Sequence, residues 1–189
     1  CEYDTAFAFS RAGADPDVMV IRNRNSQEVE DSFKEMSERI KTANMIMIPG
    51  GFSAGDEPEG SGKFIAAAFR NAAVTESVRD LLFNRDGLML GICNGFQALM
   101  KLGLLPYGDI LPLEHDGPTL TFNRIGRHQS AYVSTKIVSN NSPWLSFTNE
   151  GDTYEIAISH GEGRFCGSEA LLKELFAKGQ VATQYVDAE

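Results

Sequence analysis

The sequence predicts an α/β fold, with a doubly wound, mostly parallel sheet flanked by helices. In its first half, segments with helical periodicity alternate with short runs that are almost wholly apolar. Such runs are typical of parallel strands that are buried on both faces. Two of them end in glycine-containing turns, as strands do where their carboxyl ends border a crevice. The chain has 189 residues, enough for one self-sufficient core, so we expect a single domain over residues 1–189.

The first elements follow from periodicity and capping. Ala6–Ala12 has a helical pattern, and Val18–Arg22 is an apolar run of strand length. Asn25 is expected to cap the next helix, because Glu28 follows at the spacing of a capping box. Along that helix, apolar side chains recur at intervals of four and three, at Val29, Phe33, Met36 and Ile40.

The later elements change in character beyond Pro106. Before it we expect strands at Met45–Ile48 and Leu88–Leu90 and helices at Lys63–Asn71, Thr75–Phe83 and Asn94–Leu102, the last ending at Gly103. After it, strands with no long helices between them are expected at Thr119–Asn123, Ala131–Val138 and Tyr154–Ser159, followed by a helix at Ala170–Ala177.

Composition excludes several classes of function. The 17 basic and 26 acidic residues give a net charge of −9, which argues against nucleic acid or an anionic membrane as the main partner. The three cysteines form no CxxC pair and no metal-ligand cluster with the three histidines. This pattern favours a reducing compartment. Because no apolar run approaches the roughly 20 residues of a membrane span, we expect a cytoplasmic protein.

The most informative stretch is Gly91–Gln97, which lies between an expected strand and an expected helix. Cys93 has glycines two residues before it and two after it. A nucleophile elbow needs small residues at these positions, because the chain reverses sharply there. A lone cysteine beside a strand is often only a buried apolar residue, but a buried thiol does not require the two glycines.

The position of Cys93 also favours a reactive thiol. At the N-terminus of a helix, the dipole and the unpaired N–H groups stabilise a thiolate. The N–H of Asn94, the next residue, could donate to an oxyanion. A second donor is expected from the glycine-rich turn Pro49–Ser53, which ends the preceding strand. A phosphate-binding loop is the alternative for this turn, but the turn lacks the spacings of the known phosphate-binding motifs.

His160 and Glu162 lie near the end of the last predicted strand. If the chain stays extended there, a spacing of two places both side chains on one face. Glu162 could then hold the imidazole of His160 while His160 takes the proton of the thiol. His115 and His128 have no such neighbours, and we expect them on the surface or in loops.

Together, these motifs resemble the class I (triad) glutamine amidotransferases, whose fold is flavodoxin-like. Within that family they are most similar to the glutaminase part of phosphoribosylformylglycinamidine synthases, enzymes of purine biosynthesis. Beyond the Cys93 motif, the similarity rests on Cys1–Asp4, Ala12-Gly13, Pro49–Asp56 and Ser159–Arg164. It covers nearly the whole chain.

The resemblance implies a role for each site residue. Cys93 attacks the side-chain amide of glutamine and releases ammonia, His160 transfers the proton, and Glu162 orients His160. The other implied residues are the oxyanion donors Gly51 and Asn94, the pocket residue Gln97, the flanking residues Phe52 and Ser53, and two residues that anchor the glutamine backbone, Asn123 and Arg127. The implied partner is a synthetase domain or subunit that receives the ammonia. The resemblance implies no cofactor in this domain, and ATP and magnesium in the synthetase.

Two departures from the family pattern concern the ends of the chain. Family members begin with an apolar strand ahead of the position of Cys1 and continue with a closing strand segment past the position of Glu189. We therefore expect the chain to be part of a larger polypeptide. Two other functions remain open: an amidotransferase that supplies a different synthase, and a catalytically silent interaction domain of the same fold.

Overall fold

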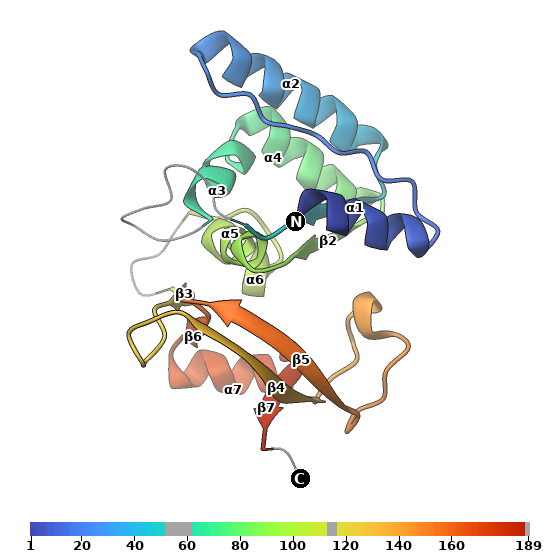
Figure 1. The fold of residues 1–189 in the computed structure, drawn as a ribbon. Helices are drawn as coiled ribbons and strands as arrows, with labels where there is room; N and C mark the ends of the chain where they lie inside the picture. Colours follow the sequence, from blue (N-terminus) through green and yellow to red (C-terminus); the bar gives the residue numbers. More distant parts are fainter. Residues whose placement is uncertain (52–61, 113–116, 188–189) are drawn as a thin grey trace. The chain divides into compact units, whose positions relative to one another are not determined.

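The computed structural model describes residues 1–51, 62–112 and 117–187. The chain divides into two compact units, Cys1–Leu113 and Glu114–Glu189, which are coloured blue to green and yellow to red in Figure 1. The single domain expected from the sequence remains a prediction.

The first unit contains a parallel strand pair and most of the helices. Its strands are β1 (Met45–Ile48) and β2 (Leu88–Gly91). Its helices are α1 (Glu2–Arg11), α2 (Ser26–Thr42), α3 (Lys63–Phe69), α4 (Ala72–Arg79), the π-helix η1 (Asp80–Asn84), α5 (Asn94–Leu102) and α6 (Leu104–Tyr107). β1 pairs with β2 in parallel, with Ile48 opposite Gly91. The predicted α/β class is confirmed, and the carboxyl ends of both strands lie at the same edge.

Helix α2 begins at the predicted cap. The side-chain oxygen of Asn25 accepts a hydrogen bond from the N–H of Glu28 at 3.0 Å. The helix lies along α4, and Figure 1 shows the two side by side. Their buried hydroxyls meet where Ser37 Oγ lies 2.8 Å from Ser77 Oγ. The apolar core beneath them includes Met36, Ile40, Val74, Val78 and Leu81.

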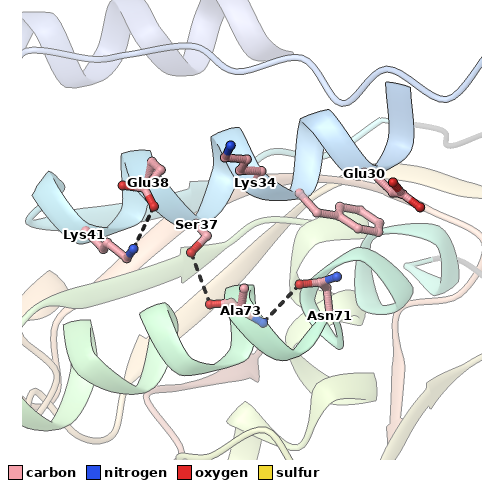
Figure 2. A pocket seen from close by; sticks show the side chains of 8 residues that line it. Glu30, Lys34, Ser37, Glu38, Lys41, Asn71 and Ala73 are labelled. Carbon is pink, nitrogen blue, oxygen red and sulfur yellow. Dashed lines mark hydrogen bonds and ion pairs between the residues drawn. The ribbon is translucent and has the colours of Figure 1, made fainter. Parts of the chain in front are cut away.

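A surface hollow of about 330 Å³ lies over this helix pair (Figure 2). Its wall combines side chains of α2 with Asn71 and Ala73 at the start of α4. Asn71 caps α4 by accepting hydrogen bonds from the N–H groups of Ala73 and Val74. None of the residues singled out from the sequence for catalysis or substrate binding lines this hollow.

The prediction of a strand at Val18–Arg22 is wrong. The segment is irregular and belongs to no sheet of the described chain. The N–H of Arg22 donates a hydrogen bond to Ser32 Oγ at 2.9 Å, where a residue in a sheet would bond to a neighbouring strand. Met19 and Ile21 pack against the core while the two valines are exposed. The alternating exposure along this apolar run therefore reflects docking on the core and not pairing in a sheet.

In the second unit the strands pair in the antiparallel sense. Its elements are β3 (Thr119–Thr121), β4 (Gln129–Ile137), the 3-10 helix η2 (Pro143–Leu145), β5 (Thr153–His160), β6 (Arg164–Cys166), α7 (Glu169–Ala177) and β7 (Thr183–Val186). β4 lies between β5 and β7, and β3 pairs with β6. Thr121 is opposite Arg164, so the chain leaving β3 runs beside the turn that joins β5 to β6.

Within the described segments, no helix has the length and apolar character needed to cross a membrane.

Candidate functional site

Cys93 occupies a strained turn between β2 and α5. Its backbone angles are φ 55° and ψ −112°. Cys93 and Asp86 are the non-glycine residues with positive φ in the described part of the chain. Such a conformation is costly unless the surrounding structure enforces it, and it is found where a nucleophile is held at a strand-to-helix turn. The side chain of Cys93 is exposed, so the turn presents the thiol to solvent.

The two glycines around Cys93 are required by close backbone contacts. A Cβ added to Gly91 would lie 2.6 Å from the carbonyl oxygen of Gly95. A Cβ added to Gly95 would lie 2.0 Å from the carbonyl oxygen of Ile48. Both distances are far below van der Waals contact, so neither position can hold a side chain in this backbone. The structure supplies the physical reason for the glycine spacing seen in the sequence.

The turn after β1 passes beside the thiol. A Cβ added to Gly50 would lie 3.0 Å from the Cβ of Cys93 and 3.8 Å from its Sγ. Gly51 follows with φ 115°, a conformation that favours glycine. Backbone N–H groups of this turn can therefore approach a group bound at Cys93. The two flanking residues expected to contact substrate, Phe52 and Ser53, lie outside the described residues.

Asn94 and Gln97 are both on α5, immediately after the elbow, and both are buried. Asn94 directly follows Cys93, as an oxyanion donor in this kind of turn should. The N–H of Gln97 donates to the carbonyl oxygen of Cys93 at 3.0 Å, closing the first turn of the helix. Their contacts with an oxyanion or a substrate remain predictions.

In the second unit, His160 ends β5 with its imidazole held on two sides. Nδ1 lies 3.0 Å from Oδ1 of Asn123. The ring packs against the backbone of Gly163, because a Cβ added there would lie 2.3 Å from both Nδ1 and Cε1. Neither contact was predicted from the sequence, although Gly163 lies within the motif that contains His160. The contact of Nδ1 with Asn123 and the packing against Gly163 together define the orientation of the ring.

Asn123 and Arg127 were expected to anchor the backbone of glutamine. Asn123 Nδ2 donates to the carbonyl oxygens of His160 at 2.8 Å and of Arg127 at 3.2 Å. The Arg127 residue is exposed. The polar atoms of Asn123 therefore bind the protein itself, and a contact of either residue with substrate remains a prediction.

Glu162 lies in a bend between β5 and β6. The premise that the chain stays extended from His160 to Glu162 is therefore wrong, and the same-face argument does not apply. That Glu162 orients His160 remains a prediction. His128 is exposed, as expected, and its Nε2 lies 2.9 Å from Ser159 Oγ. His115 lies outside the described residues.

The candidate residues are thus divided between the two units. Those of the first unit are Gly51, Cys93, Asn94 and Gln97, and those of the second are Asn123, Arg127, His160 and Glu162. In the ranges the structure describes, no cluster of three or more histidine, cysteine or acidic side chains could hold a metal ion. The chemistry available is that of a thiol at an elbow and an oriented imidazole.

The sequence model of a family described as the CobB/CobQ-like glutamine amidotransferase domain matches residues 1–189. The chain belongs to this family. The resemblance to glutamine amidotransferases seen in the motifs is therefore confirmed over the whole chain.

Among proteins of this amidotransferase family, the chain is similar to the phosphoribosylformylglycinamidine synthase subunit PurQ of several organisms. It is 34% identical to that of Methanococcus maripaludis, with all of this chain and 64% of the relative aligned. It is 33% identical to that of Treponema denticola, over 96% of this chain and 66% of the relative. It is 32% identical to that of Campylobacter jejuni, over 98% of this chain and 69% of the relative. The chain thus spans about two thirds of the length of these relatives.

The chain also shares its fold with a solved structure. A chain of the structure titled "Structure of PurLQS from Thermotoga maritima" superposes with a TM-score of 0.68 at 23% identity, covering all of this chain and 70% of that one. At this level of identity, the similarity shows the fold alone.

Proposed function

We propose that the chain is the glutaminase component of a phosphoribosylformylglycinamidine synthase. The observation that carries the proposal is the geometry of Cys93. The residue has the strained φ of a nucleophile elbow, between two glycines that no other residue could replace, at the N-terminus of α5. The names of its relatives support the choice of pathway, because all three are subunits of this synthase.

In the proposed reaction, His160 takes the proton of the Cys93 thiol, and the thiolate attacks the carboxamide carbon of glutamine. The carbonyl oxygen becomes an oxyanion, which accepts hydrogen bonds from the N–H groups of Gly51 and Asn94. When the tetrahedral intermediate collapses, the C–N bond breaks and His160 returns the proton to the departing nitrogen, which leaves as ammonia. Water, deprotonated by His160, then cleaves the thioester to give glutamate and the free thiol.

The ammonia passes to a synthetase partner in this proposal, and that partner uses ATP and magnesium to form the amidine. Glu162 orients His160 through the turn that carries both residues, and Gln97, Phe52, Ser53 and Arg127 line the glutamine site. The cytoplasmic location expected from the sequence belongs to the same proposal. The other residue expected to anchor the glutamine backbone, Asn123, has a different role in this proposal.

The test is to combine the purified chain with its synthetase and to measure glutamate release and amidine formation. We expect Cys93→Ala to abolish glutamine-dependent synthesis, while ammonium salts still support it through the intact synthetase. Cys1→Ala is the matched control and should retain both activities, because Cys1 is an exposed cysteine outside the elbow. Glutamine-dependent turnover in Cys93→Ala would show that another residue is the nucleophile.

The acceptor substrate tests the pathway separately. The proposal requires glutamine-dependent amidation of formylglycinamide ribonucleotide by the complex. Glutamate release without amidation of this acceptor would leave Cys93 as the nucleophile and assign the chain to an amidotransferase of another pathway.

A further inference from the structure

We propose that Asn123 is a positioning residue that holds the imidazole of His160 in the tautomer with the proton on Nδ1. The inference rests on the proposed function, because it assigns Asn123 a part in the same glutaminase reaction. Asn123 follows β3 and His160 ends β5, and both belong to the second unit. The contacts that hold the imidazole all lie within that unit.

The orientation of the Asn123 side chain follows from its other hydrogen bonds. Nδ2 lies 2.8 Å from the carbonyl oxygen of His160 and 3.2 Å from that of Arg127. Both partners are acceptors, so the atom that faces them must be the NH₂ group. The opposite atom, 3.3 Å from the N–H of Gly163, must then be the carbonyl oxygen. The amide is therefore fixed with Oδ1 toward the imidazole.

This orientation determines the tautomer of His160. Oδ1 can only accept a hydrogen bond, so Nδ1, 3.0 Å away, must be the donor. In a neutral imidazole the second nitrogen then carries the lone pair. Nε2 of His160 is therefore the atom that can take a proton from the thiol, as a general base in a triad must.

The same residue also fixes the turn that carries the imidazole. The backbone N–H of Asn123 donates to the carbonyl oxygen of Gly161 at 2.8 Å, in addition to the side-chain bonds to His160 and Gly163. Gly163 in turn supports one face of the ring. Asn123 therefore fixes both the position of the turn and the proton on the ring.

The alternative is that Asn123 anchors the backbone of glutamine. An anchor binds substrate and transition state alike, so its loss raises KM with little change in kcat. A positioning residue affects the chemical step, so its loss lowers kcat with little change in KM. The two roles therefore predict opposite kinetic signatures.

The kinetic test uses the complex with the synthetase. We expect Asn123→Ala to lower kcat for glutamate release by about 10- to 100-fold, with KM for glutamine within about threefold of the unsubstituted protein. Asn140→Ala is the matched control, since Asn140 also donates from Nδ2 to a backbone carbonyl, that of Thr148 at 3.0 Å, and it should leave kcat unchanged. An increase in KM at unchanged kcat, or no change in either constant, would overturn the proposal.

A spectroscopic test is independent of activity. In the ¹⁵N-labelled chain, couplings between ring nitrogens and carbon-bound protons report which nitrogen of His160 carries the proton, and His160→Asn identifies the signals. We expect the proton on Nδ1 in the unsubstituted chain and in Asn123→Asp, which keeps an acceptor oxygen, and a mixture of tautomers in Asn123→Ala. A proton on Nε2 in the unsubstituted chain would overturn the inference. The expected spectrum together with no glutaminase activity in the complex would contradict only the proposed function.

Discussion

Oδ1 of Asn123 lies 3.0 Å from Nδ1 of His160, although the two residues are 37 positions apart in the chain. The antiparallel pairing of β3 with β6 places them together, because it aligns the end of β3 with the turn after β5. A residue that the sequence suggested as a substrate ligand therefore contacts the expected general base. The turn after β5 also contains Gly163, and a substitution there should perturb His160 as well.

The first prediction concerns Gly163, against which the imidazole packs. In Gly163→Ala the new Cβ would lie 2.3 Å from Nδ1 and Cε1 of His160, so the ring must move. We expect kcat for glutamate release to fall by about 100-fold, because a displacement of about 1 Å can have an effect of that size. Rate measurements on the complex with the synthetase check this.

Gly161→Ala is the matched control for Gly163→Ala. Gly161 is two residues earlier in the same turn, and no heavy atom lies within 4 Å of a Cβ added there. This variant should keep most of its activity. If the two variants lose activity equally, the backbone of the turn is responsible and the ring contact is not.

The second prediction concerns Gly95, which lies two residues after Cys93 in the elbow. In Gly95→Ala the Cβ would lie 2.0 Å from the carbonyl oxygen of Ile48. That oxygen already accepts the N–H of Ile92 at 3.1 Å, so it cannot move without breaking the ladder between β1 and β2. We expect a loss of at least about 2 kcal/mol in the free energy of unfolding, measured by urea denaturation. Ile92→Ala, at a residue with 53% of its surface exposed, should change stability by less than about 1 kcal/mol.

Local sequence signals predicted the elements on which this elbow depends. The bounds of β1 and α5 agree with those expected from the apolar run and from the periodic helix ended by Gly103. The capping of α2 by Asn25 was also predictable, because both partners lie within one helical turn. The glycines around Cys93 indicated the shape of the turn before any contact was known. In each case the residues that determine the element lie within about ten positions of one another in the sequence.

The sequence did not predict what depends on pairing between distant segments. β6 has only three residues, too few to show a period, and its partner β3 lies more than 40 positions earlier. β7 is similarly short, with four residues of which the first three are exposed. The contact between Asn123 and His160 depends on the β3–β6 pairing, so no local pattern could reveal it. Val18–Arg22 misled for the opposite reason, because an irregular segment that docks on a core can contain the same short apolar run as a strand.

The third prediction concerns the selectivity of thiol labelling. Cys1 and Cys93 are both exposed, and Cys166 is partly buried. A glutamine analogue with an electrophilic diazo-ketone should modify Cys93 and spare both others, because attack requires a bound substrate and an activated thiolate. Peptide mass spectrometry after limited labelling measures this. Iodoacetamide is the control reagent, because it does not bind as glutamine does, and it should also label Cys1. Equal labelling of Cys1 and Cys93 by the analogue would indicate exposure alone.

The fourth prediction concerns the response of stability to acid. Arg79 of α4 binds the carboxylate of Asp109 through Nε at 2.7 Å and Nη2 at 3.0 Å, and the N–H of Ile110 donates to the same carboxylate at 2.7 Å. These hydrogen bonds, that of Arg79 foremost, lower the pKa of Asp109 from its usual value of 3.8. Because the folded state favours the ionised form of Asp109, the pair stabilises the protein at pH values above the usual pKa of 3.8. The stabilisation is lost as the pH falls through the lowered pKa.

Asp109→Asn should therefore be less stable than the unsubstituted protein at pH 7, by about 1 kcal/mol or less because the pair is partly exposed. The difference should shrink as the pH is lowered from about 5 to about 2, where the carboxylate becomes protonated. Urea denaturation at a series of pH values measures both. Asp15→Asn, which removes an exposed carboxylate, is the control and should change stability little at any pH. A constant difference between Asp109→Asn and the unsubstituted protein across this range would show that the ionisation of Asp109 does not contribute to stability.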